Sequence, residues 1–200
     1  MQITDMERIK QTEKRIELNN DGEAFYMIGA CYLAGKSPMK QDHKKAIELL
    51  NRAAELGSEA AHHTLGVVYA QGRGVEKDEK KAMYHLRIAA IGGMLESRYI
   101  LGLEANRPDW FSLGTKQQGI ELAMKHLIIA AEAGHDDSLK SVKSAYAQGY
   151  VMKDVFAKVL RAHQAVQDDT KSDARDKAAK YWIKNDRRKK TPTDFSRNKI

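Results

Sequence analysis

Apolar residues recur at helical spacing in the second quarter of the chain. Ala61 and Leu65, with the apolar residues that follow them, fall three or four positions apart and so share one face of a helix. Ser58 precedes this stripe and is a good helix N-cap. Gly72 follows the stripe and readily takes the left-handed conformation that ends a helix. The pattern predicts a helix over 58–71.

A second helical pattern follows after a short, glycine-containing turn. It begins near Asp78 and carries Ala82, Leu86 and Ala89 on one face, and Gly92 ends it. Two helices joined in this way form a hairpin. Because one hairpin cannot bury its own apolar face, it needs neighbours stacked against it.

The same hairpin recurs along the chain. Ala-Ala pairs begin at Ala53, Ala89 and Ala130, so the period is 36 and then 41 residues. A glycine also recurs in the middle of each first helix, where it costs about 1 kcal/mol relative to alanine. This repeated cost suggests that a neighbouring helix passes too close for a side chain. The structural repeat positions are Gly29, Tyr32, Gly35, Ala53, Gly66, Tyr69, Gly72, Gly74, Ala82, Ala89, Gly102, Ala123, Ala130 and Gly134.

The repeats predict a central solenoid over 22–169 with a flank on each side. We expect its units at about 22–57, 58–92, 93–134 and 135–167, the last of which is degenerate and suits a terminal cap.

The two flanks differ in character. Residues 1–21 read as a charged N-terminal helix. Residues 170–200 read as a separate C-terminal helix capped by Ser172, followed from Asp186 by a basic disordered tail.

The repeated residues resemble the Sel-one-like repeat (SLR), a relative of the tetratricopeptide repeat (TPR). The second unit matches that motif at Ala61, Leu65, Gly66, Tyr69, Gly72, Gly74, Val75, Asp78, Lys81, Ala82, Ala89, Ala90 and Gly92. The runs 125–131 and 161–165 are more narrowly similar to the SLR set of marine diatoms.

The resemblance implies an all-α fold. The expected form is a right-handed α/α superhelical solenoid of about four helical hairpins, TPR-like, with flanking helices. It also implies a non-enzymatic scaffold or adaptor that binds a partner protein on its concave surface.

The charge is unevenly placed along the chain. There are 34 basic and 27 acidic residues, a net charge of +7. Residues 171–200 contain 11 basic and 4 acidic residues, so the whole excess lies in this segment. The single cysteine excludes an intramolecular disulfide, and the charged N-terminus has no apolar signal-peptide core. These features predict an intracellular protein, cytoplasmic or, if the tail is an import signal, nuclear.

No residue pattern points to catalysis, a cofactor or a metal. The seven histidines include no HExxH pair. Gly72-Arg73-Gly74 lacks the third glycine and the preceding strand of a dinucleotide-binding loop. Cys31 lies close to an apolar stripe, and we interpret it as a small buried hydrophobe. We therefore expect neither enzyme activity nor a cofactor.

The first helices supply candidate contacts for a partner peptide or helix on the concave surface. They are the residues three positions before each repeat glycine, with the equivalent in unit four: Tyr26, His63, Tyr99 and Lys140. Trp110 and Phe111, in the insertion 107–119 of unit three, have two readings. They are either interface anchors or a filling for the gap where Ala105 replaces the repeat tyrosine.

The basic run of the tail is a second candidate contact, through Arg187, Arg188, Lys189 and Lys190. It suits a solubilising tail, a nuclear-localisation signal, or a contact with nucleic acid or an anionic membrane. Phosphate binding by such a run depends strongly on salt. This nucleic-acid or nuclear role is the alternative to the scaffold.

Overall fold

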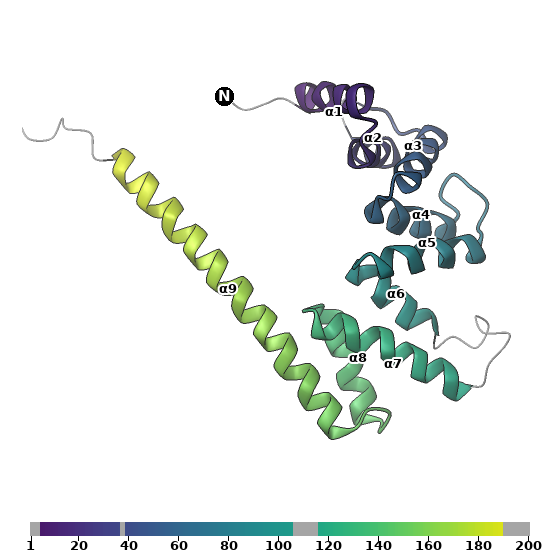
Figure 1. Ribbon diagram of the computed structural model, residues 1–200, viewed down its shortest axis with the longest axis vertical. Helices are drawn as coiled ribbons and strands as arrows, with labels where there is room; N and C mark the ends of the chain where they lie inside the picture. Colours follow the sequence, from purple (N-terminus) through teal and green to yellow (C-terminus); the bar gives the residue numbers. More distant parts are fainter. Residues whose placement is uncertain (1–4, 37–38, 106–115, 190–200) are drawn as a thin grey trace, which may run out of the picture.

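In the computed structural model, the described residues (5–36, 39–105 and 116–189) form nine α-helices and no strand. The chain is therefore a helical solenoid, as the sequence predicts. Figure 1 shows the helices stacked along an arc, with the last helix on its open side. In chain order they are α1 (Asp5–Asn19), α2 (Gly22–Ala34), α3 (His43–Glu55), α4 (Glu59–Gln71), α5 (Glu79–Ile91), α6 (Leu95–Ala105), α7 (Lys116–Glu132), α8 (Asp136–Ala147) and α9 (Lys153–Lys189).

Side chains at the expected positions begin the helices of the hairpins. Ser58 accepts a hydrogen bond from the Ala61 amide at 3.2 Å and so caps α4. Asp42 and Asp78 cap α3 and α5 in the same way, each accepting from the backbone amide three residues later. The predicted boundaries of this hairpin at Ser58 and Asp78 are confirmed.

The hairpins α2–α3, α4–α5 and α6–α7 each close on a glycine in the middle of the first helix. A Cβ on Gly66 would lie 2.7 Å from Leu86 Cγ and 3.2 Å from the Ala82 carbonyl oxygen. A Cβ on Gly102 would meet Leu127 Cγ at the same 2.7 Å. In the second and third hairpins the two helices thus approach to a distance that excludes a methyl group, whereas the approach at Gly29 is looser.

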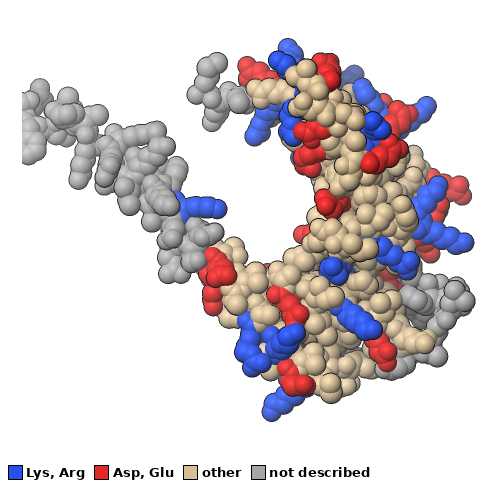
Figure 2. All heavy atoms as spheres, in the orientation of Figure 1, with Lys and Arg blue, Asp and Glu red and all other residues tan. Residues whose placement is uncertain are grey.

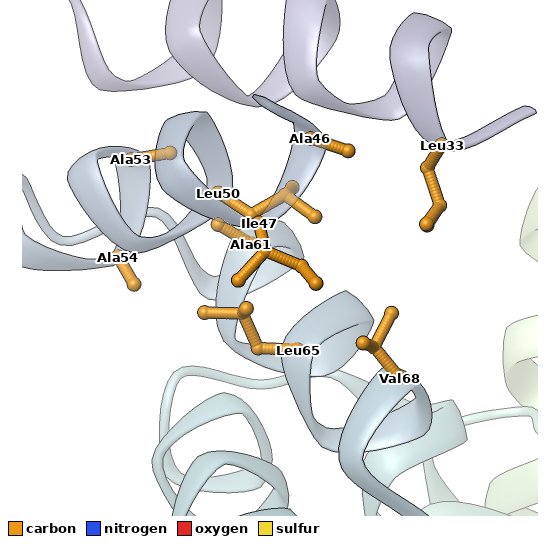
Figure 3. Packing of buried hydrophobic residues seen from close by; sticks show 9 residues of the cluster. All are labelled: Leu33, Ala46, Ile47, Leu50, Ala53, Ala54, Ala61, Leu65 and Val68. Carbon is orange, nitrogen blue, oxygen red and sulfur yellow. The ribbon is translucent and has the colours of Figure 1, made fainter. Parts of the chain in front are cut away.

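Small residues let successive hairpins approach one another. The alanine pairs are all buried, and Ala53, Ala89 and Ala130 are fully inaccessible to solvent. Figure 3 shows one shared core, in which side chains of α2, α3 and α4 converge around Leu50 and Leu65. Each hairpin therefore buries its apolar face against the next.

The third hairpin departs from the pattern at Ala105. In the first two units the repeat tyrosine pairs with a lysine: Lys45 Nζ donates to Tyr32 Oη at 2.7 Å, and Lys81 Nζ lies 5.3 Å from the Tyr69 ring centroid. In the third, a Cβ on Gly119 would lie 2.7 Å from the Ala105 carbonyl oxygen. The start of α7 therefore lies close against the backbone at the end of α6.

The C-terminal flank differs from its prediction. Helix α9 passes through Ser172 without a break, so Ser172 does not begin a separate helix. The helix also continues through Asp186 to Lys189, where the sequence predicts disorder; residues 190–200 lie outside the described residues. The reason is that 153–189 contains no glycine or proline, and a serine inside a helix costs only tenths of a kcal/mol.

The glycine contacts give a first testable prediction. In Gly66→Ala, overpacking against Leu86 outweighs the gain in helix propensity, so the free energy of unfolding falls by about 1–2 kcal/mol. Gly29 is the matched control, because its added Cβ would lie 3.1 Å from the nearest atom, and Gly29→Ala is expected to be nearly neutral. Urea denaturation followed by circular dichroism measures both. A Gly66→Ala variant more stable than the wild type would disprove the close approach.

Candidate functional site

The first helix of each hairpin has one face that its second helix does not cover. The repeat glycine marks the side of the first helix that faces the second helix. At 100° per residue, the residue two positions before this glycine lies about 160° away from it around the helix axis, and the residue one position after it lies about 100° away. These positions, with the acidic residue six positions before the glycine on α2 and α6 and its equivalent on α8, are called the first-helix face. It consists of Glu23, Met27 and Ala30 on α2; Thr64 and Val67 on α4; Glu96, Ile100 and Leu103 on α6; and Asp137, Ser141 and Ser144 on α8. Glu59 is not part of it, because it lies seven positions before Gly66 and packs against Gly92 at the end of α5.

Two large apolar side chains of this face are exposed. Met27 is 42% and Leu103 is 44% accessible to solvent, and each lines a pocket. A pocket of about 430 Å³ lies between α6, α7 and α8, where Leu103 and Met124 face the hydroxyls of Ser141 and Ser144. A pocket of about 750 Å³ lies between α1 and α2 beside Met27. Such pockets suit apolar anchors of a partner protein.

The first helices of the three hairpins carry more acidic than basic residues. Helices α2, α4 and α6 contain four glutamates and a single basic residue, the half-buried Arg98. The second helices α3, α5 and α7 contain eight lysines and arginines and five glutamates. In Figure 2, red and tan atoms predominate along the middle of the hollowed edge, whereas blue and red atoms both project from the outer edge. The acidic excess is confined to these helices, because Arg8, Arg15 and Lys36 line the pocket beside Met27 and α8 contains two aspartates and two lysines.

Two of the predicted partner contacts lie in the seams between hairpins. His63 Nδ1 is 2.8 Å from the hydroxyl oxygen of Ser97, which is fully buried on the next first helix. Burial lowers the pKa of His63, and the charge of Glu96 opposes this only in part. The Tyr99 ring packs against His135, with 5.0 Å between ring centroids. These two side chains hold successive first helices in register.

The other predicted contacts have varied surroundings. Tyr26 packs half-buried against the core of the first two hairpins, whereas Lys140 is exposed and pairs with Asp137 at 2.8 Å. Cys31 is half-buried and lines the pocket beside Met27, rather than lying in the core as predicted.

The aromatic pair of the insertion lies wholly outside the residues that the structure describes, and the basic run of the tail lies partly outside them. Trp110, Phe111 and Lys190 lie outside the described residues. Residues 187–189 form the end of the α9 backbone.

A histidine pair fixes the second hairpin. His62 Nδ1 and His85 Nδ1 are 2.9 Å apart, and the His85 ring stacks on Tyr69 with an interplanar angle of 9°. Burial, followed by the neighbouring charges of His62 and Lys81, lowers the pKa of His85 to about 4. The pKa of His62 is also lowered, chiefly by burial. At neutral pH one uncharged ring donates to the other.

The described part of the chain shows no metal centre. Across 5–36, 39–105 and 116–189, no three His, Cys, Asp or Glu side chains are placed together to hold a metal ion. Among the same residues, no helix has both the length and the apolar character needed to cross a membrane.

Sequence reasoning missed Met27 and Leu103 as surface residues. The signal was present, because the repeat glycine marks the side that faces the second helix. Positions 160° and 100° away point away from the second helix, whereas the predicted positions lie only about 60° away. Of these positions Met27 and Leu103 are exposed, while Ile100 packs against the core of α5 and α6. Residues such as His63 therefore face a neighbouring hairpin instead of solvent.

Comparison with known proteins agrees with this architecture. A family model described as Sel1 repeat matches residues 22–58, 60–94 and 96–135, which is more than half of the chain. Proteins of this family generally mediate protein–protein interaction and are generally not enzymes. No curated protein gives a significant sequence match.

Solved structures of other repeat proteins are similar to the chain. A Sel1 repeat protein from Oxalobacter formigenes is 27% identical with a TM-score of 0.63, over 83% of this chain and 64% of that one. A protective antigen present in uropathogenic Escherichia coli strains, displaying an SLR fold, is 26% identical with a TM-score of 0.64, over 76% of this chain and 33% of that one. The chain thus spans less than two thirds of the length of either.

The histidine pair predicts how stability depends on pH. Unfolded histidine has a pKa near its ordinary value of 6.5, whereas that of His85 is about 4 in the folded chain. Between these values the unfolded state binds the extra proton, so the free energy of unfolding falls as pH falls.

His85→Asn keeps a polar atom at the Nδ1 position but cannot titrate. Its stability is expected to fall less than that of the wild type between pH 7 and pH 4, because carboxylate effects are common to both chains. Urea denaturation at several pH values measures the difference. Parallel stability profiles would show that the pair does not titrate as described.

Proposed function

Because the chain belongs to the Sel1 repeat family, we propose that it is a non-enzymatic scaffold that binds a partner protein through the first-helix face. The observation that carries the proposal is the exposure of Met27 and Leu103 on that face, each beside a pocket. An exposed apolar side chain beside a pocket lets a partner bury apolar area without rearranging the solenoid.

The charges beside the face differ from one end to the other. Glu23 and Glu96 are exposed on the face, whereas Arg8, Arg15 and Lys36 line the pocket beside Met27. A partner helix or extended peptide laid across these helices would meet apolar contacts bordered by charges of both signs.

Paired variants test the proposal. Met27→Asp and Leu103→Asp place a charge among the apolar contacts, so recovery of the partner is expected to fall about tenfold or more. Ile91→Asp is the matched control, because Ile91 is 82% exposed on the second helix α5. Cross-linking and affinity purification from the native cell, with quantitative mass spectrometry, measure recovery of each partner. Circular dichroism checks that all variants keep their helices.

Comparing variants of the first-helix face with a variant of the second helix α5 shows which surface binds the partner. Loss with the first-helix variants and full recovery with Ile91→Asp supports the proposal. If Ile91→Asp loses the partners and the first-helix variants keep them, the binding surface is on the outer helices and the proposal is wrong.

A further inference from the structure

Three basic side chains from consecutive helices lie near one another in the second and third hairpins. They are Arg87 near the end of α5, Arg98 at the end of the first turn of α6, and His126 in α7. Helices α5, α6 and α7 follow one another along the arc in Figure 1, and α6 packs against both of its neighbours. Burial, and then the charges of Arg98 and Arg87, lower the pKa of His126, so both guanidinium groups lie near its ring.

No acidic side chain among the residues that the structure describes neutralises this cluster. Neither Arg87 nor Arg98 forms an ion pair with another described residue, and both charges that act on the His126 ring are positive. Glu79 and Glu132, on the same helices, pair instead with lysines outside the cluster, at 2.9 Å and 3.1 Å. Because Arg98 is half-buried, its charge is partly removed from water without a counter-ion. A bound anion would supply the missing negative charge.

The histidine adds a hydrogen-bond donor to the two guanidinium groups. His126 Nδ1 is buried and has no hydrogen-bond partner, whereas Nε2 is not buried and makes no hydrogen bond with a described residue. Its lowered pKa keeps the ring neutral near pH 7, with one proton shared between two possible nitrogens. The proton is more stable on Nε2, where water or a ligand can accept it, than on the buried Nδ1. Nε2–H is therefore the free donor.

The charge of the cluster fits an oxyanion with two negative charges. The two arginines supply two positive charges, and the neutral ring donates a hydrogen bond without adding a third. Guanidinium groups bind phosphate oxygens through paired, charge-assisted hydrogen bonds. A phosphomonoester carries about −1.5 to −2 near pH 7, whereas a carboxylate or a phosphodiester carries a single charge.

We propose that Arg87, Arg98 and His126 bind a phosphomonoester, whose oxygens accept hydrogen bonds from both guanidinium groups and from His126 Nε2. The phosphoryl group belongs to a free phosphorylated small molecule or to a phosphorylated side chain of a partner protein. No residue of the first-helix face takes part, because two of the three side chains are on second helices and Arg98 lies about 40° from the glycine side of α6. The inference therefore goes beyond the proposed function and does not depend on it.

NMR titration of the full chain with sodium phosphate tests this first. The signals of the arginine Nε–H groups and of the His126 ring are followed up to about 20 mM phosphate, with sodium chloride keeping the ionic strength constant. We expect saturable shifts with a Kd of about 1 mM or below. The pKa of His126 should rise on binding, because a bound negative charge stabilises the protonated ring. Shifts that do not saturate, or that chloride alone reproduces, would overturn the inference.

Single substitutions identify the residues of the site. Arg87→Gln and Arg98→Gln each remove one charge and one paired donor, so the phosphate affinity is expected to fall about tenfold or more. Lys80→Gln is the matched control, because Lys80 is exposed on the same side of α5 about 10 Å from Arg87, and its loss should change the affinity less than about twofold. Circular dichroism checks the fold, and the exposed Arg87 can be replaced without disturbing the core. Wild-type affinity in both arginine variants would contradict the proposal.

Further ligands distinguish the source of the phosphoryl group. A capped phosphoserine peptide that binds as tightly as inorganic phosphate indicates a phosphorylated partner protein, whereas binding of inorganic phosphate alone indicates a free small molecule. Dimethyl phosphate, a singly charged diester, should bind about fivefold more weakly or worse. Equal affinity for the diester would overturn the assignment to a phosphomonoester. Leu103→Asp, on the first-helix face, should leave phosphate binding unchanged, so this proposal and the scaffold proposal succeed or fail separately.

Discussion

The close contact between the glycine of each first helix and the leucine of its second helix sets the geometry of the solenoid. Gly66 against Leu86 and Gly102 against Leu127 leave no room for a methyl group, so the two helices of these hairpins pack closely with the glycine side facing the second helix. That orientation decides which residues of the first helix face inward. The direction of the seams and of the exposed face depends on this contact.

The first and second helices of the hairpins also differ in their charged residues. Lysines such as Lys45 and Lys81 pair with the repeat tyrosines of their hairpins, and the basic residues gather on the second helices. The first helices of the hairpins carry four glutamates and one arginine. The repeat thus places most of its basic residues on the second helices.

Most of the fold could be predicted from the sequence, because its determinants are local. Ser58 and Asp78 begin their helices where the caps predict, and the repeat glycine correctly indicates a close helix approach. The extent of α9 could not be predicted in the same way. Ser172 has the chemistry of a cap, but nothing before it ends the preceding helix, so its cap potential is unused.

The candidate surface was harder to predict than the fold. Choosing His63 and Tyr99 required knowing how far one hairpin rotates on the next, and the seam contacts with Ser97 and His135 depend on that rotation. It is a tertiary quantity with no local signal. Only the position of Leu103 relative to Gly102 was available from helix geometry alone.

Hydroxyl-radical footprinting of the assembled chain tests the central claim most directly. It compares side-chain oxidation in the free chain with that in its complex. The account predicts that Met27 and Leu103 become protected on assembly, while Tyr84 and Ile91, which are exposed on the second helix α5, react as before. Protection of Tyr84 and Ile91 with no change at Met27 and Leu103 would contradict it.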